Sequence, residues 1–385
     1  MNCTKNTHKV YSAEEIALGI SYSHPAKKDS ESCAVGTLTN YKRDVDKDDT
    51  LAIKERHKIV HYGLSNNDLE NIDKKLLSQK QFLDYSFIYD RINQTKIPLS
   101  DIFISANHSP NRYYSEIQNR VNTLSTLAKE RGLKALFMTL TLPSEYHKYK
   151  TLSREGITNK LIPNPKYNGT TPKDAVKELT KMFARLRHDR ALKDGLSKEN
   201  RIYFRVNEPH KDGTPHTHIL MFVPVDRVDR VKKAFKRLFD IRANDIQDDI
   251  QNSTSYVMKY INKTLPLSKK DKLSEKDKYL NAWYSHNRVI RFHSSRTLAP
   301  LDIYRLVHSR YSLYALTKLI SEEHFKIYIT LDTGKVMEII DEWGDIVYAR
   351  GSNYDVITIG TSNKGDYFSN NTQTNDSAIG IQIWI

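Results

Sequence analysis

The stretch from 208 to 223 reads Glu-Pro-His-Lys-Asp-Gly-Thr-Pro-His-Thr-His-Ile-Leu-Met-Phe-Val. We interpret it as the end of one strand, a tight turn at Asp212-Gly213, and a second strand that carries two histidines. Side chains at positions i and i+2 of a strand lie on the same face, so His216 and His218 can direct two imidazoles to one point. Two converging imidazoles are suited to bind a metal ion.

A third metal ligand can come from either of two nearby residues. Glu208 lies before the turn, and pairing of the two strands would return its carboxylate to the imidazoles. His210 is the competing candidate, but it lies in the turn, where its orientation is less fixed. With fourteen histidines in the chain, about half an HxH pair is expected by chance, so the pair alone is weak support for a metal site.

A second pattern lies in the segment 253–265, for which the spacing of apolar residues predicts a helix. Tyr256 and Tyr260 are four residues apart, so both hydroxyls project from one helix face. A tyrosine can act as a covalent nucleophile. Lys259 and Lys263 each follow a tyrosine by three residues, where an ammonium can stabilise a phenolate or a five-coordinate phosphate.

Tyrosine pairs with this spacing also arise by chance. The chain holds 23 tyrosines, which give roughly one such pair at random. A second pair, Tyr85 and Tyr89, has no lysine at the same offset and precedes the metal strand. We interpret that pair as core aromatic residues.

The flanking sequence predicts the fold around these motifs. The segment 134–143 alternates and ends at a proline, as a strand does, with Thr139 and Thr141 on one face. Helices are expected from Ser115 to Gly132, from 172 to about 190, near 227–238 and near 301–320, with strands at 201–207 and 216–223. The last of these is apolar on both faces and should be central. This order suits an α+β palm, an antiparallel sheet with helices packed on one side.

Charge and composition divide the chain into three parts. We expect a mostly helical amino-terminal region at 1–105, a central domain at 106–321, and a small β-rich tail at 322–385. The formal net charge is +14, but the tail carries ten acids and four bases, which leaves +20 on residues 1–321. A basic body suggests a polyanionic partner such as nucleic acid. Basic faces on the helices near 172–190 and 227–237 can follow phosphates, or they are ordinary solvated faces.

The cysteine content and the hydropathy of the chain indicate its cellular compartment. Its two cysteines, Cys3 and Cys33, give no disulfide framework and indicate a reducing compartment. No apolar run has the length of a membrane span, and the first residues contain no signal-peptide core. We expect a soluble, intracellular protein with no membrane partner.

Several segments together resemble one family, the replication gene A proteins of bacteriophages, within the HUH endonuclease superfamily. The resemblance runs in order from about 108 to 308 and does not reach 322–385. It includes Phe-Met-Thr-Leu-Thr-Leu-Pro-Ser at 137–144 and Pro-Lys-Tyr-Asn-Gly-Thr-Thr at 165–171. It is closest at 208–218 and at 256–263, where the family has Glu-Pro-His-x-Asp-Gly-Thr-Pro-His-x-His and Tyr-x-x-Lys-Tyr-x-x-Lys. The region of Arg291-Phe and Arg296 is also similar.

The resemblance implies a ferredoxin- or RRM-like HUH palm and a rolling-circle replication initiator. In that reading His216, His218 and Glu208 hold Mg²⁺ or Mn²⁺, and a tyrosine becomes joined to the 5′-phosphate of a nicked origin strand. The implied partners are single-stranded or locally melted origin DNA, a host helicase and the replication machinery, in the cytoplasm of a bacterium or a phage-infected host. Position and resemblance also place Thr139, Thr141, His147 and Arg296 among the residues expected to contact DNA.

Three other functions fit parts of the same pattern. A plasmid relaxase or a transposase of the superfamily would use the same chemistry on another DNA, but the paired tyrosines favour the initiator. A catalytically silent DNA-binding protein would need only the basic body. A metal-dependent hydrolase that acts through water would need the histidine strand and not the tyrosines.

Overall fold

The computed structural model describes most of the chain, with gaps. The described residues are 58–90, 93–154, 157–193, 197, 200–266, 273–330, 335–350, 354–358 and 381–383. The expectation of helices within residues 1–50 lies outside the described residues, and so does most of the tail beyond residue 358. Among the described residues, no helix combines the length and the apolar composition that crossing a bilayer requires.

The centre of the fold is a five-stranded sheet with the order β10-β5-β9-β8-β11, in which all neighbours are antiparallel. Its strands are β5 (Leu133–Thr141), β8 (Tyr203–Pro209), β9 (Pro215–Pro224), β10 (Asp245–Gln247) and β11 (Phe292–Ser294). The central place of β9 confirms the prediction from its sequence. It is buried along nearly its whole length, because both of its faces are covered.

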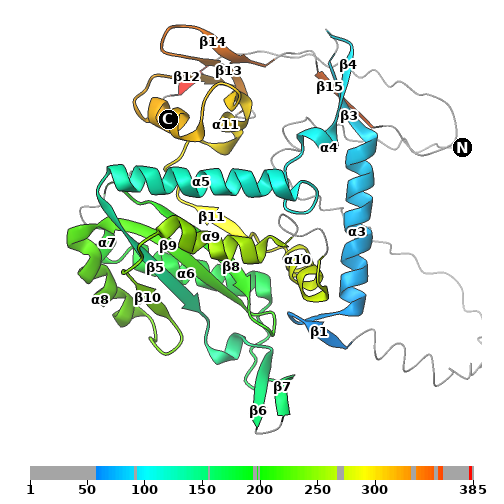
Figure 1. Ribbon diagram of the computed structural model, residues 1–385, viewed down its shortest axis with the longest axis vertical. Coiled ribbons are helices and arrows are strands. Elements are labelled where there is room, and N and C mark those ends of the chain that lie inside the picture. The colour runs from blue at the N-terminus through cyan, green and yellow to red at the C-terminus, as the bar shows by residue number, and fades with distance from the viewer. Residues whose placement is uncertain are drawn as a thin grey trace, which may run out of the picture.

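Helices cover both faces of this sheet (Figure 1). One layer contains α5 (Pro110–Glu130), α9 (Ser253–Thr264), α11 (Leu301–Val307) and α12 (Leu313–Ser321), and the other contains α6 (Pro172–Arg187), α7 (Arg190–Lys193) and α8 (Val228–Leu238). The α+β class and the antiparallel sheet are confirmed, but the expectation of helices on one side is wrong. The reason is visible in β5, where Phe137 enters one core and Met138 enters the other.

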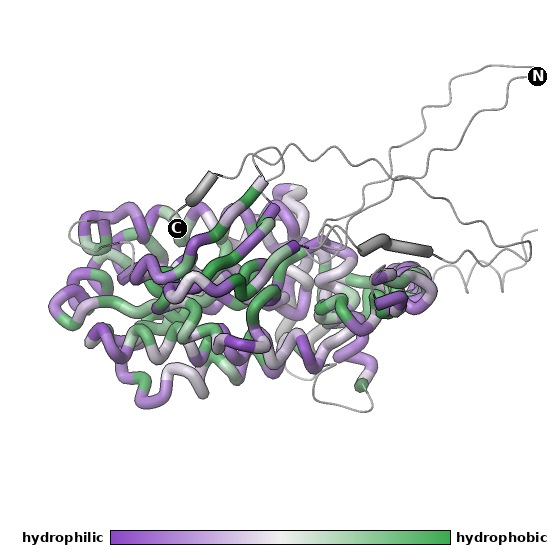
Figure 2. The backbone as a smooth tube through the Cα atoms, turned by 90° about the horizontal axis from the view of Figure 1, so that it is seen from above, coloured by the Kyte–Doolittle hydropathy of each residue, from purple (hydrophilic) through white to green (hydrophobic). Residues whose placement is uncertain are grey.

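Two helices differ from their predicted extents. The helix expected from Ser115 begins at Pro110, which suits a first helical position because proline lacks the N–H that would otherwise be unpaired. The single helix expected near 301–320 is divided into α11 and α12. Figure 2 shows the hydrophobic residues concentrated inside the body formed by these layers.

The amino-terminal region is helical in its largest element but also contains short strands. Its elements are β1 (Ile59–His61), β2 (Leu64–Ser65), α3 (Asn66–Tyr85), β3 (Ser86–Asp90), β4 (Thr95–Pro98) and α4 (Leu99–Ile102). Ser65 and Asp68 form a capping box that fixes the start of α3. The interpretation of Tyr85 as a core aromatic residue is wrong, because its side chain is 50% exposed at the end of this helix.

The turn between β1 and β2 packs against the turn between β8 and β9. Gly63 and Gly213 both have positive φ, at 73° and 89°. A Cβ on Gly213 would lie 2.3 Å from the carbonyl oxygen of Tyr62, and one on Gly63 would lie 2.8 Å from that of Asp212. Only glycine permits backbones to approach this closely. The helix α10 (Glu275–Asn287) supports the same turn, since Trp283 Nε1 donates to the Gly213 carbonyl at 3.0 Å.

The remaining elements lie at the periphery. A hairpin of β6 (Tyr149–Arg154) and β7 (Ile157–Pro163) projects from one end of the sheet, and short 3₁₀ turns occur at η1 (Ser144–Tyr146) and η2 (Val225–Arg227) (Figure 1). The tail is β-rich, as predicted. It contains β12 (Lys326–Ile329), β13 (Val336–Ile340), β14 (Ile346–Ala349) and β16 (Ile381–Ile383) in one sheet, whereas β15 (Tyr354–Thr358) pairs with β3.

Candidate active site

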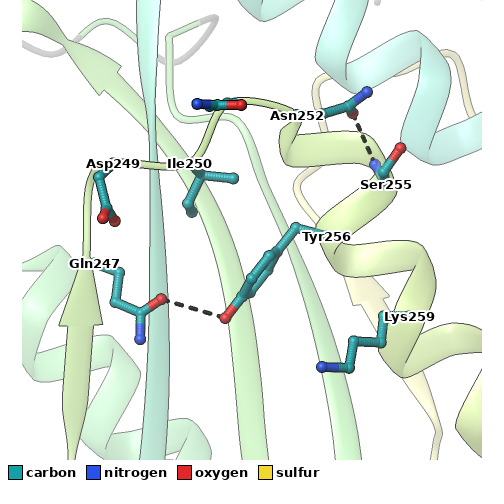
Figure 3. Close-up of a pocket in the computed structure, with 8 residues that line it drawn as sticks. Gln247, Asp249, Ile250, Asn252, Ser255, Tyr256 and Lys259 are labelled. Atoms are coloured by element: carbon teal, nitrogen blue, oxygen red, sulfur yellow. Dashed lines mark hydrogen bonds between the residues drawn. The ribbon is translucent and has the colours of Figure 1, made fainter.

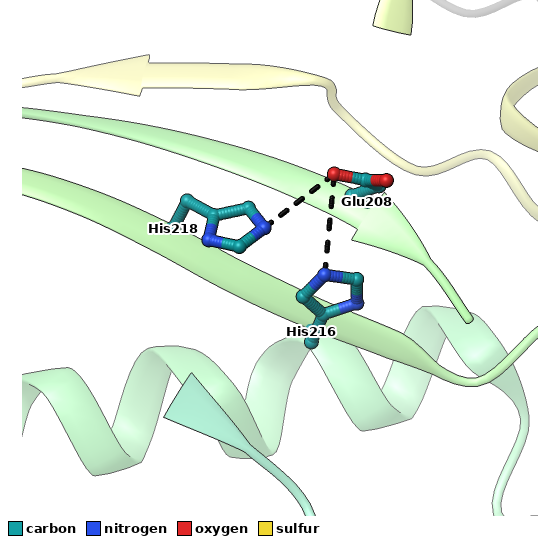
Figure 4. A group of neighbouring side chains, drawn as sticks. All are labelled: Glu208, His216 and His218. Atoms are coloured by element: carbon teal, nitrogen blue, oxygen red, sulfur yellow. Dashed lines mark ion pairs between the residues drawn. The ribbon is translucent and has the colours of Figure 1, made fainter. Parts of the chain in front are cut away.

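The hairpin of β8 and β9 brings together the three residues expected to bind a metal. Glu208 lies directly opposite His216, and Val206 lies opposite His218. Glu208 Oε2 is 3.4 Å from His218 Nε2 and 4.0 Å from His216 Nε2. Figure 4 shows the three side chains directed to one point. All three ligand atoms lie within 4.8 Å of one another, close enough for one ion to contact them all.

The electrostatics of this cluster suit a divalent cation. Glu208 is 3% exposed, and its Oε2 has no hydrogen-bond partner among the described residues. Burial opposes ionisation, but contacts with His218 and with the ammonium of Lys263 outweigh it and lower the pKa of Glu208 to about 2. Burial also lowers the pKa of His216 well below its usual value, which keeps its imidazole neutral. A carboxylate beside neutral imidazoles is a donor set for metals.

Thr139 fixes the orientation of one imidazole. It lies opposite His218 in the pairing of β5 and β9, and its hydroxyl is 3.1 Å from His218 Nδ1. The other ring nitrogen is then free to face Glu208, which is the arrangement that supporting contacts give to metal-binding histidines. Thr141 lies opposite His216, and its backbone N–H donates to Asn244 Oδ1.

The alternative ligand, His210, lies outside the group of three. Its ring packs on His216 with centroids 4.1 Å apart, and burial lowers its pKa. On its other side is His147, at 5.3 Å, whose Nδ1 is 2.9 Å from Asp212 Oδ2. That hydrogen bond raises the pKa of His147. The structure therefore places His147 against the turn that precedes the metal strand, with no contact to the three candidate ligands themselves.

The two tyrosines lie beside this cluster in different surroundings. The ring of Tyr260 packs on His218, with centroids 3.9 Å apart. Tyr256 is one turn earlier on α9, and the two phenol rings are 5.9 Å apart. Phe137 contacts both of them, edge-on to Tyr256 at 4.6 Å and stacked on Tyr260 at 5.1 Å. Burial raises the pKa of Tyr260, and its neighbours Tyr256 and Glu208 raise it further.

The two lysines of the motif also differ in position. Lys263 forms an ion pair with Glu208, although its own side chain is 60% exposed. Lys259 instead lines an open cavity beside Tyr256 (Figure 3). The Tyr256 hydroxyl donates to Gln247 Oε1 at 3.2 Å at the edge of that cavity. Each lysine is therefore near one component of the site, Lys263 near the ligands and Lys259 near a tyrosine.

One predicted residue lies away from this cluster. Arg296 is exposed and follows β11, where Ser294 pairs with Phe204. Because β11 runs antiparallel to β8, Arg296 lies toward the opposite end of β8 from Glu208. The basic helix faces are partly neutralised: Lys177 and Lys181 on α6 pair with acids of the same helix, and Lys232 on α8 pairs with Asp248.

Two contacts in the site were missed from the sequence. Gln247 reaches Tyr256 from β10, a three-residue edge strand without a recognisable pattern. Asp212 was assigned only to the turn, yet its buried carboxylate accepts from His147 and from the Thr214 hydroxyl. The sequence signal for the contact between Asp212 and His147 is an acid in a tight turn beside several histidines.

Comparison with known proteins assigns the family. The sequence profile of the bacteriophage replication gene A protein (GPA) family matches residues 38–267, more than half of the chain. The chain belongs to this family. The match confirms the resemblance seen in the motifs, although it begins nearer the amino terminus than 108 and ends before the region of Arg291 and Arg296.

Individual relatives agree with this assignment. The chain is 30% identical over 267 residues to the "Replication gene A protein" of Escherichia phage 186, which covers 61% of the chain and 35% of the relative. It is 31% identical over 208 residues to the "Replication protein" of Haemophilus phage HP1 (49% and 24%), and 30% identical over 245 residues to a "Probable replication endonuclease" of Salmonella typhi (56% and 28%). The matches span about a quarter to a third of the length of these relatives. No solved structure matches the chain.

Proposed function

We propose that this chain is a metal-dependent, site-specific DNA endonuclease and strand transferase that initiates rolling-circle replication. The observation that carries the proposal is the packing of Tyr260 on the candidate metal ligand His218, with Tyr256 one helical turn away. A nucleophile has to lie beside the group that polarises its target. Tyr260 contacts a candidate ligand directly, and Tyr256 lies next to Tyr260. The names of the relatives, replication protein and replication endonuclease, support the same reaction class.

The proposed cofactor is Mg²⁺ or Mn²⁺, held by Glu208, His216 and His218. The unpartnered Glu208 Oε2 and the neutral His216 imidazole support this ligand set. When bound, such an ion would supply Lewis-acid stabilisation of the charge on a phosphate. Thr139 would keep His218 in the orientation that binding requires, through the hydrogen bond to Nδ1.

The covalent step is a transfer of one phosphodiester to a tyrosine. The phenol oxygen forms a bond to phosphorus, and the bond from phosphorus to the 3′ oxygen of the preceding nucleotide breaks. The phenol proton is lost to solvent, and the released 3′ oxygen takes up a proton. The strand is then held as a 5′-phosphotyrosine, and its free 3′-hydroxyl can prime synthesis. Lys259 and Lys263 would stabilise the charge that develops during this step.

Two tyrosines allow the reaction to occur twice without release of the strand. After one round of synthesis, the second tyrosine would cut the regenerated origin. The new 3′-hydroxyl would then attack the first phosphotyrosine, which closes the circle and frees the first tyrosine. The shared helix face of Tyr256 and Tyr260 supports this alternation. The proposed partners are single-stranded or melted origin DNA, a host helicase and the replication machinery, all in the cytoplasm.

The four residues that the sequence proposes as DNA contacts are assigned to different parts of the DNA. Thr139 and Thr141 border the ligand strand and lie where a bound phosphate would be close. His147 and Arg296 lie farther away, so we propose them only as contacts to DNA that flanks the reacting phosphate. A plasmid relaxase or transposase remains the second candidate, and the family membership and the tyrosine pair favour the initiator over it.

The test captures the covalent intermediate. The full chain is incubated with a randomised pool of short single strands and Mn²⁺, and the products are separated on a denaturing gel. We expect a protein–DNA adduct that is absent with EDTA and absent in the Tyr256→Phe/Tyr260→Phe variant. Tyr85→Phe, which removes an exposed hydroxyl far along the chain, is the matched control and should form the adduct normally. DNA cleavage that persists in the double variant would exclude the tyrosine mechanism.

A further inference from the structure

A cavity of about 510 Å³ opens beside Tyr256. It is formed by the end of β10, the connection to α9 and the first turns of α9. Its lining includes Gln247, Asp249, Ile250, Gln251, Ser255, Tyr256 and Lys259. Its volume lies in the range of about 300–1,000 Å³ that small-molecule sites occupy.

The chemistry of the lining matches one nucleotide unit. The Tyr256 ring and Ile250 give apolar surface, against which a base can stack. Gln251 offers both donors and acceptors, and the Asp249 carboxylate can accept from an exocyclic amino group. Lys259 supplies the cation for a phosphate. In Figure 3, Asp249 and Lys259 lie on opposite sides of the Tyr256 ring, as the base end and the phosphate end of a nucleotide require.

Gln247 connects this cavity to the reacting atom. Its Oε1 accepts from the Tyr256 hydroxyl at 3.2 Å, and its Nε2 donates to Asp245 Oδ2 at 2.6 Å. The amide is thus held by a neighbour on its own strand, and it in turn holds the phenol. The Tyr256 hydroxyl thus lies at the edge of the cavity, and the Tyr256 ring lies 5.9 Å from that of Tyr260, which packs on His218.

We propose that the cavity binds the nucleotide whose 5′-phosphate becomes joined to Tyr256, and that Gln247 positions the Tyr256 hydroxyl for that attack. The inference rests on the proposed function and adds a subsite to it. Tyr260 packs instead on His218 and Phe137, so the cavity serves Tyr256 and not Tyr260. Asp249 makes adenine, cytosine or guanine, the bases whose exocyclic amino groups can donate to it, preferred over thymine.

The first test uses variants that retain one nucleophile. In the Tyr260→Phe background, Ser255→Phe should fill the cavity and slow adduct formation by about tenfold, the scale of losing one stacked base. Ser115→Phe, the same change at an exposed position of α5, is the matched control. Gln247→Ala should slow the same reaction by about fivefold, the scale of one neutral hydrogen bond.

The comparison with the other tyrosine separates positioning from general damage. In the Tyr256→Phe background, Gln247→Ala should affect adduct formation far less than in the Tyr260→Phe background. Sequencing of DNA captured by Tyr260→Phe should show thymine depleted at the first nucleotide after the point of attachment. The proposal would be overturned by equal effects of Gln247→Ala in the two backgrounds, or by an even distribution of the four bases at that position.

A second test does not depend on cleavage. Saturation-transfer NMR is recorded in EDTA with each deoxynucleoside 5′-monophosphate in turn. We expect base resonances of dAMP, dCMP or dGMP to receive saturation from the parent chain, and to lose it in Ser255→Phe but not in Ser115→Phe. If no adduct ever forms but this difference is seen, the proposed function fails and the nucleotide site stands. If none of the mononucleotides gives a signal, or Ser255→Phe leaves the signal unchanged, the nucleotide site is refuted.

Discussion

Thr139→Val should weaken metal binding although Thr139 is not a ligand. The substitution keeps the shape of the side chain and removes the hydroxyl that lies 3.1 Å from His218 Nδ1. His218 is only 7% exposed, so its ring nitrogen would lose a partner that water cannot easily replace. An unpaired buried polar group costs about 1–3 kcal/mol. The loss of such a supporting contact typically lowers metal affinity by about tenfold to a hundredfold, or about 1.4–2.7 kcal/mol.

Thr141→Val provides the matched control, on the same strand and the same sheet face. Thr141 lies opposite His216, but its recorded hydrogen bond is made by the backbone N–H, which valine retains. Titration calorimetry of the full chain with Mn²⁺ should therefore show a larger dissociation constant, and so weaker binding, for Thr139→Val, and a dissociation constant close to that of the parent chain for Thr141→Val. Parental affinity in Thr139→Val, or equal losses in the two variants, would show that the hydroxyl does not orient His218.

Three further predictions concern the surroundings of the site. Gly213→Ala should lower the free energy of unfolding by more than about 2 kcal/mol in chemical denaturation. The left-handed backbone costs about 1–2 kcal/mol for a residue with a side chain, and the new methyl group would also collide with the Tyr62 carbonyl. Gly169→Ala is the control, because Gly169 has a similar φ of 84° but open space around it, so only the backbone cost is expected. Asp212→Asn should destabilise the chain more at pH 5.5 than at pH 8.5. The contact with Asp212 raises the pKa of His147, so it stabilises the fold below the pKa that His147 has in the unfolded chain, and this stabilisation is lost as the pH rises through the pKa of the folded state. An equal loss of unfolding free energy at both pH values would contradict this. Lys263→Met should tighten Mn²⁺ binding by a few-fold while slowing adduct formation, because the ammonium competes for Glu208; weaker binding in this variant would show that Lys263 supports the ligand set instead.

The parts of the site that the sequence predicted are those that depend on local rules. A short turn fixes the register of a hairpin, so the opposition of Glu208 and His216 follows from their spacing around Gly213. The helical period likewise places Tyr256 and Tyr260 on one face. Both patterns act over a few residues, and neither needs knowledge of the rest of the chain.

The parts that the sequence did not predict depend on contacts between distant segments. Gln247 reaches Tyr256 only because β10 adds to the edge of the sheet beside β5, more than a hundred residues away in sequence. The pairing of Gly63 with Gly213 is equally remote. The helices on the second face were misjudged because a strand that is apolar on both faces, such as β9, shows that each face is covered but not which segments cover it.

One strand determines how the nucleophiles and the candidate ligands are placed relative to each other. Phe137 and Thr139 are two residues apart on β5 and therefore lie on one face. Phe137 packs on both tyrosines, and Thr139 holds His218. Since β5 is paired on both sides, by β9 and β10, it is among the least mobile elements of the sheet. A site on such a rigid element keeps its geometry without help from the ligand. In the proposed mechanism, in which the two tyrosines act in turn, the reacting phosphate rather than the protein would therefore move.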